Sequence, residues 1–281
     1  MYFVMNTLLW TCLLFPIAVL KIAIPFRTSR RFLNKVAVRI AGCWVFVNSL
    51  GLQVTGKMKF EVEGDDTLKE NEWYLVMSNH QSWADIPILQ KVLYKKTPFL
   101  KFFLKKELIW VPILGAAWWA LDFPFMKRYS RDELLKNPAL KNKDIEITQK
   151  ACEKSKDTPV SLMTFVEATR FTQEKKERTG ALYENLLRPK AGSVGFIMQT
   201  MGDRLDNILD ITIYYPEGVQ ELWGFLCGKV RTVKVKIDRI PITEDLVGNY
   251  SNDTQYKKKL QHWLNQRWAK KDEIIKQYRS S

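Results

Sequence analysis

A histidine and an aspartate that lie five residues apart have the clearest chemical potential in this sequence. His80 and Asp85 follow a short apolar run, Tyr74–Ser78, which is typical of a buried strand. Catalytic residues of open α/β sheets usually lie beyond the carboxyl ends of such strands. A carboxylate bonded to one imidazole nitrogen fixes the tautomer and raises the basicity of the other nitrogen. The pair could therefore take the proton of a hydroxyl group that attacks an acyl carbonyl.

A structural explanation of the same residues remains open. Ser82 and Asp85 have the spacing of a helix capping box, with Asp in place of the more usual Glu. An acidic residue in a first helical turn also suits the helix dipole. In that case His80 would be an ordinary turn residue, and the spacing alone does not decide between the two interpretations.

Around this motif, β-forming runs alternate with helical segments. Residues 57–63 alternate between polar and apolar types, as an edge strand does, and residues 159–166 are a strong candidate for a buried strand. We expect a polar helix near residues 143–154 and further strands at residues 208–215 and 230–237. This alternation predicts an α/β fold in which a mixed β-sheet is flanked by helices.

An apolar stretch at residues 1–20 predicts a membrane helix, since as a helix it would extend about 30 Å, the thickness of a bilayer core. A basic cluster follows at residues 21–39, which predicts that the domain after it faces the cytoplasm. Residues 36–54 predict a second helix that lies in the interface or packs on the first. A signal peptide fits less well, because its charges would precede the apolar run. A buried pair of soluble helices is the remaining alternative.

The net charge of +14 is concentrated at the two ends. Residues 1–60 hold eight Lys or Arg and no acid, and residues 256–281 carry a net +6, so the middle is neutral. This pattern suits an enzyme held on an anionic membrane, and no nucleic-acid-binding motif supports the competing explanation. We predict an anchor at 1–56, a catalytic domain at 57–255, and a basic amphipathic helix at 256–281 that caps the domain or touches lipid headgroups.

Ordered motifs between residues 74 and 216 resemble the glycerolipid acyltransferases, a family that includes 1-acylglycerol-3-phosphate acyltransferases. The matching segments are Asn79-His80 to Asp85, Leu104-Lys105-Lys106-Glu107-Leu108, Phe125-Met126-Lys127-Arg128, Phe165-Val166-Glu167-Ala168-Thr169-Arg170, and Leu187 to Gly192 with Ile211 to Pro216. The residues of the second and fourth motifs resemble those of a branch of the family that includes lysocardiolipin acyltransferases and certain bacterial homologues. The resemblance implies a glycerol-3-phosphate acyltransferase-like fold.

The reaction implied by this resemblance is transfer of a fatty acyl chain from acyl-CoA or acyl carrier protein to the sn-2 hydroxyl of lysophosphatidic acid. His80 would deprotonate that hydroxyl, and Asp85 would orient the imidazole. We expect no metal and no bound cofactor, because the acyl thioester is a co-substrate. The expected location is the cell inner membrane, with the domain on the cytoplasmic side. Two alternatives remain: an acyltransferase for another lysophospholipid such as lysocardiolipin, and a membrane lipid-binding protein without catalysis.

Cations in the motifs are the expected ligands of the substrate phosphate, because Arg and Lys form charge-assisted bonds to its oxygens. Arg128 and Arg170 are the main candidates, with Lys105 in support. Glu167 and Thr169 are expected to bind the rest of the acceptor, although an ion pair with Arg170 would also explain Glu167.

Two positions depart from the family pattern. Ala168 stands where Gly is usual, so a φ > 0 conformation there becomes unfavourable. Tyr214-Tyr215-Pro216 replaces a short apolar-Pro-apolar pattern. The second departure bears on the choice of acceptor rather than on the reaction.

Overall fold

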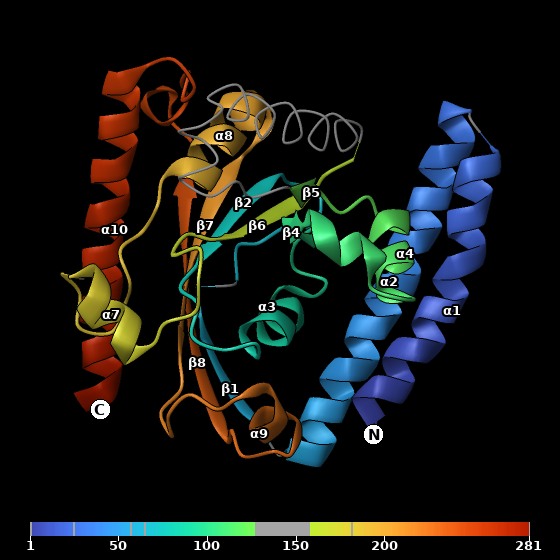
Figure 1. Ribbon diagram of the computed structural model, residues 1–281, viewed down its shortest axis with the longest axis horizontal. Coiled ribbons are helices and arrows are strands. Elements are labelled where there is room, and N and C mark those ends of the chain that lie inside the picture. Colours follow the sequence, from blue (N-terminus) through green and yellow to red (C-terminus); the bar gives the residue numbers. More distant parts are fainter. Residues whose placement is uncertain are drawn as a thin grey trace.

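The computed structural model describes residues 2–24, 26–56, 58–64, 66–126, 158–180 and 182–280. A six-stranded sheet has the strand order β1-β8-β7-β2-β6-β3, and β4 and β5 form a separate pair (Figure 1). The strands are β1 (Lys59–Glu63), β2 (Tyr74–Ser78), β3 (Leu100–Phe102), β4 (Leu104–Lys105), β5 (Phe125–Met126), β6 (Ser161–Phe165), β7 (Asn207–Tyr214) and β8 (Thr232–Pro241). The α-helices are α1 (Tyr2–Ala23), α2 (Arg27–Gly56), α3 (Asp85–Leu93), α4 (Leu114–Ala120), α7 (Gln173–Thr179), α8 (Gly192–Met201), α9 (Leu222–Leu226) and α10 (Thr254–Ser280). Three 3-10 helices complete these elements: η1 (Lys106–Trp110), η2 (Gly202–Arg204) and η3 (Glu244–Leu246).

The predicted mixed sheet flanked by helices is confirmed. Strands β3, β6, β2 and β7 are parallel, β8 is antiparallel to β7, and β1 is parallel to β8 at the edge. Ser78, the last residue of β2, lies opposite Phe165 of β6 and Ile211 of β7. The carboxyl ends of β2 and β6 therefore meet at one edge of the sheet, and β7 extends three residues further. The polar helix expected near residues 143–154 lies outside the described residues.

The central strand β2 is buried on both faces, as parallel strands usually are. Because side chains alternate along a strand, Leu75 and Met77 pack with α8 and α10, whereas Tyr74 and Val76 pack with α1, α2 and α3. In Figure 1, α10 lies on one side of the sheet and the α1–α2 pair lies on the other. The fold therefore places α3, which begins at Asp85, between the sheet and the N-terminal helices.

Helices α1 and α2 pack against each other in antiparallel orientation. Their contact contains polar groups: Asn6 Nδ2 donates to Asn48 Oδ1 at 2.8 Å, and Trp44 Nε1 donates to Thr7 Oγ1 at 3.2 Å. Both helices are long and apolar enough to cross a membrane, a test that core helices also pass. Only 28% of the α1 stretch and 33% of the α2 stretch is buried, however, so most of this apolar surface is open. That exposure favours membrane association over a buried soluble pair.

The basic C-terminal helix α10 packs on the sheet. Leu260, Leu264 and Trp268 face the core. Lys271 is 1% exposed and pairs with Asp210 of β7 at 2.8 Å between Nζ and Oδ1. Burial lowers the pKa of Lys271, while Asp210 opposes that shift. The apolar spacing along the helix thus serves to cover one face of the sheet.

Candidate active site

The turn between β2 and α3 brings His80 and Asp85 into direct contact. His80 Nδ1 lies 2.8 Å from Asp85 Oδ2. The same carboxylate oxygen accepts hydrogen bonds from the backbone N–H groups of Gln81 at 2.7 Å and Ser82 at 2.9 Å. Asp85 therefore orients the histidine and also accepts from the Ser82 N–H, which is one half of the capping-box pattern. The reciprocal bond is not formed, because Ser82 Oγ accepts from the Ala84 N–H and the N-cap residue of α3 is Ala84, without a side-chain cap.

The donors around Asp85 set the tautomer of the His80 ring. Asp85 is fully buried, whereas the His80 side chain is 13% exposed. A carboxylate surrounded by donors acts as an acceptor, so the Nδ1 atom of His80 carries the proton that Asp85 receives. Nε2 then keeps its lone pair, which is the arrangement that a general base requires.

The second oxygen of Asp85 is held by Tyr215, a residue that sequence reasoning did not assign to the site. Its hydroxyl donates to Asp85 Oδ1 at 2.5 Å. Tyr215 is 3% exposed, and burial together with the Asp85 charge raises its pKa well above the usual range. The contact arises because β7 is longer than β2, which places Tyr215 beside the turn that follows β2. The only signal in the sequence was its position directly after a strand in the fourth motif.

Asn79, the other polar residue of the first motif, has a structural role. Its Nδ2 donates to the Ile213 carbonyl and its Oδ1 accepts from the Ile213 N–H, both at 2.9 Å. These are the backbone groups that β2 would pair if it continued past Ser78. The Asn79 amide therefore substitutes for the missing strand and fixes the start of the β2–α3 turn against β7.

The strand β6 positions the histidine ring from another direction. The Phe165 ring stacks on the His80 ring with centroids 3.8 Å apart and an angle of 12° between the planes. The Phe171 N–H donates to the His80 carbonyl at 2.7 Å. The imidazole is thus held by Asp85 at one ring nitrogen and by Phe165 on one ring face.

Glu167 and Thr169, the expected acceptor-binding residues of the third motif, lie in different environments. Glu167 is 1% exposed and lies near the Trp268 indole and Lys271, without a hydrogen bond of normal geometry to the described residues. Burial raises the pKa of Glu167 to about 8, and the Asp85 charge adds to that shift. Thr169 Oγ1 accepts a hydrogen bond from Lys175 Nζ at 2.8 Å. The roles of both residues in acceptor binding remain predictions.

The structure describes two of the three expected phosphate ligands, Arg170 and Lys105. Arg170 is exposed, and its guanidinium lies over the Trp83 ring at 4.8 Å from the centroid, so it borders the turn that carries His80. Lys105 is exposed on β4, just beyond the carboxyl end of β3, and among the described residues no hydrogen bond joins it to His80. The expected lysine-rich strand there is only two residues long and continues as η1. Arg128 lies outside the described residues.

The conformation of Ala168 corrects one expectation. Its φ is 61°, in the left-handed region, although a methyl group makes this unfavourable. The turn around it is fixed by two backbone hydrogen bonds, from Ala168 N–H to the Phe165 carbonyl and from Lys190 N–H to the Val166 carbonyl, both at 2.9 Å. Strand β6 and the following loop thus impose on Ala168 the shape that glycine would adopt more easily.

An apolar cavity of about 170 Å³ lies between the N-terminal helices and α3. Its walls include Trp10 of α1, Trp44 of α2, and Phe102 of β3. Ile86, the residue after Asp85, also contributes to the wall. The cavity therefore extends from α3 toward the candidate membrane helices.

Several known proteins are similar to this chain. Lysocardiolipin acyltransferase 1 of Danio rerio is 25% identical over 254 residues, which cover 85% of this chain and 61% of the relative. The 1-acyl-sn-glycerol-3-phosphate acyltransferase epsilon of Mus musculus is 24% identical over 240 residues, covering 77% and 60%. The crystal structure of the 1-acyl-sn-glycerophosphate acyltransferase PlsC from Thermotoga maritima aligns with a TM-score of 0.45 and 17% identity, over 93% of this chain and 94% of that chain. This chain thus spans about three-fifths of the length of the two curated relatives.

The family model named Acyltransferase matches residues 59–216, which is more than half of the chain. The match contains the β2–α3 turn with His80 and Asp85, the third motif after β6, and Tyr215 after β7. The chain therefore belongs to the glycerolipid acyltransferase family.

Proposed function

We propose that this protein transfers a fatty acyl chain from an acyl thioester to the sn-2 hydroxyl of 1-acylglycerol-3-phosphate, giving phosphatidic acid. The observation that carries the proposal is the His80–Asp85 pair, in which both carboxylate oxygens are occupied by donors and Nε2 of the imidazole remains available. A carboxylate fixed in this way can orient the histidine and stabilise its charged form while it also holds the turn before α3.

The reaction follows from this geometry in two steps. His80 Nε2 takes the proton of the acceptor hydroxyl as its oxygen attacks the thioester carbonyl, and Asp85 stabilises the resulting imidazolium. The tetrahedral intermediate then collapses, the carbon–sulfur bond breaks, and His80 returns its proton to the thiolate. The products are the new ester and a free thiol. The acyl thioester, from coenzyme A or acyl carrier protein, is a co-substrate, so the reaction requires neither a metal nor a bound cofactor.

The surroundings of the pair support lipid substrates. The apolar cavity beside α3 suits part of an acyl chain, because its walls are largely apolar and aromatic. Arg170, held over Trp83 at the rim, offers a guanidinium for the acceptor phosphate. The open apolar faces of α1 and α2 would hold the enzyme in the inner membrane, with the catalytic domain on the cytoplasmic side, next to substrates that reside there.

A second acceptor is favoured by one specific observation. The Danio rerio relative is named a lysocardiolipin acyltransferase, and it matches 85% of this chain. Lysocardiolipin also presents a free hydroxyl beside a phosphate, so the same base and the same cations would serve it.

The acceptor is tested by incubating the detergent-purified protein with acyl-CoA or acyl carrier protein thioester and identifying the product by mass spectrometry. Lysophosphatidic acid, lysocardiolipin and lysophosphatidylcholine serve as acceptors. The proposal predicts that lysophosphatidic acid is the acceptor with the highest kcat/KM and that phosphatidic acid is its product. A higher value with lysocardiolipin would establish the second acceptor. No product with any pair of substrates would refute the enzymatic function and favour a lipid-binding protein.

A further inference from the structure

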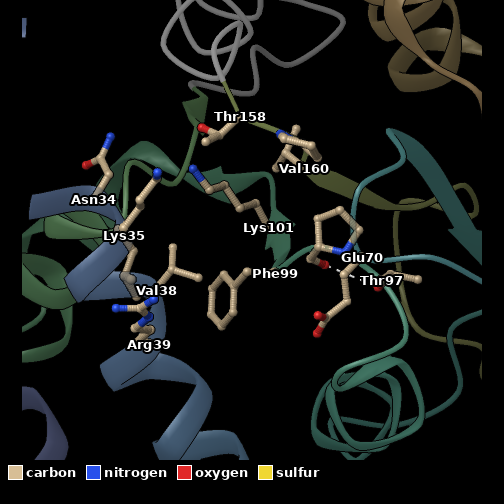
Figure 2. A pocket seen from close by; sticks show the side chains of 13 residues that line it. Asn34, Lys35, Val38, Arg39, Glu70, Thr97, Phe99, Lys101, Thr158 and Val160 are labelled. Carbon is tan, nitrogen blue, oxygen red and sulfur yellow. Dashed lines mark hydrogen bonds between the residues drawn. The ribbon is translucent and has the colours of Figure 1, made fainter. Parts of the chain in front are cut away.

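A cavity of about 340 Å³ lies at the opposite edge of the sheet from His80. Its walls are the segments that precede β3 and β6 and the facing side of α2 (Figure 2). Since these are the amino ends of parallel strands, and His80 follows the carboxyl end of β2, the cavity is separate from the catalytic turn. We refer to it as the α2 groove.

The α2 groove is rich in cations. Lys35, Arg39 and Lys101 line it, and Glu70 is the one acid among its lining residues. Lys35 and Arg39 are one helical turn apart on the same face of α2. Both are exposed, and neither has a hydrogen bond or ion pair with any described residue. Figure 2 shows Lys35 and Lys101 reaching toward the same end of the groove as Thr158, whereas Glu70 lies on the other side. An anion at this end would meet two ammonium groups and a hydroxyl.

The remaining walls and the size of the α2 groove favour an amphiphile over a free ion. Val38, Phe99 and Leu121 give it apolar walls. A neighbouring cavity of about 430 Å³ shares Val38, Arg39 and Phe99 with it, so the space extends well beyond one phosphate group. Helix α2 is also one of the two helices long and apolar enough to cross a membrane.

We propose that the α2 groove binds the headgroup of an anionic glycerophospholipid from the membrane that holds α1 and α2. The phosphate would lie between Lys35 and Lys101 near Thr158, with Arg39 further along the same groove (Figure 2), and the glycerol and first acyl carbons would contact the apolar wall. This site does not depend on the proposed acyl transfer, because its occupant need not react.

The test is a titration of the full chain in detergent with phosphatidylglycerol, followed by native mass spectrometry of bound lipid. The variant Lys35→Gln with Arg39→Gln removes two cations from the groove. The control, Arg231→Gln with Lys258→Gln, removes one Arg and one Lys from exposed positions elsewhere. We expect the apparent affinity to fall by about tenfold or more in the groove variant and to stay within about twofold in the control.

Several results would overturn the proposal. An equal loss in both variants would show a general charge effect, and no loss in either would show that the groove is not the site. Phosphatidylcholine binding with the same affinity and the same loss would exclude selection for an anionic headgroup. Competition by millimolar inorganic phosphate would identify a free anion as the ligand. The variant Lys35→Arg with Arg39→Lys keeps both charges and should retain binding, and equal melting temperatures would separate a binding loss from misfolding. Because no thioester is present, failure of acyl transfer would leave these results unchanged.

Discussion

Removal of the Tyr215 hydroxyl tests how far catalysis depends on the second oxygen of Asp85. Tyr215→Phe deletes one hydrogen bond to a fully buried carboxylate, formed at 2.5 Å. A hydrogen bond to a charged group contributes about 1.5–3 kcal/mol. The other oxygen keeps its donors from His80, Gln81 and Ser82, so Asp85 should stay in place. We therefore expect the free energy of unfolding to fall by about 1.5–3 kcal/mol and kcat to fall about 10–100-fold.

The assay is release of free thiol from acyl-CoA at saturating lysophosphatidic acid, with KM for the acceptor measured in parallel. Because Tyr215 is buried and its hydroxyl bonds to Asp85, we expect KM to stay within about twofold while kcat falls. Tyr214→Phe is a matched control, since it removes the neighbouring hydroxyl on the other side of the strand. A Tyr215→Phe enzyme with wild-type kcat would refute the view that Tyr215 positions the catalytic carboxylate.

Other substitutions test the third motif and its surroundings. Glu167→Gln should raise the melting temperature more at pH 8 than at pH 5. Burial raises the pKa of Glu167 to about 8, against 4.5 unfolded, so the acid costs stability as pH rises between these values, up to about 4–5 kcal/mol. An equal effect at both pH values would contradict this, as measured by thermal scans. Ala168→Gly should stabilise the protein by about 0.5–1 kcal/mol and Ala168→Val should destabilise it by about 1–2 kcal/mol, because φ is 61°; denaturation of both variants checks the order. Trp83→Leu should raise the acceptor KM about 2–5-fold through Arg170 and leave kcat unchanged, whereas an unchanged KM would remove Arg170 from the acceptor site.

The local patterns of the sequence were sufficient to predict the sheet and the contact between His80 and Asp85. The run Tyr74–Ser78 forms β2 with the expected bounds, because a short apolar stretch with polar flanks has few other stable arrangements. His80 and Asp85 meet because the short turn between them folds back, so that the Asp85 carboxylate bonds to the His80 ring. These features depend on neighbours in the chain, which a sequence displays directly.

Contacts between distant residues could not be predicted in this way. Tyr215 lies 130 residues from Asp85, and its approach depends on β7 being longer than β2, a matter of register. The stacking of Phe165 on His80 likewise follows from the pairing of β6 with β2. The α2 groove combines Lys35 with Lys101, which belong to different layers. Ala168 shows the reverse case, in which tertiary constraints override a residue's own preference.

The central claim is that His80 is the base in an acyl transfer. It is tested most directly by measuring thiol release from acyl-CoA, with and without lysophosphatidic acid, for the wild-type protein and for His80→Ala at equal melting temperature. The account predicts acceptor-dependent release that falls by about 10²–10⁴-fold in the variant. Acceptor-dependent release that persists at the wild-type rate in His80→Ala would contradict it.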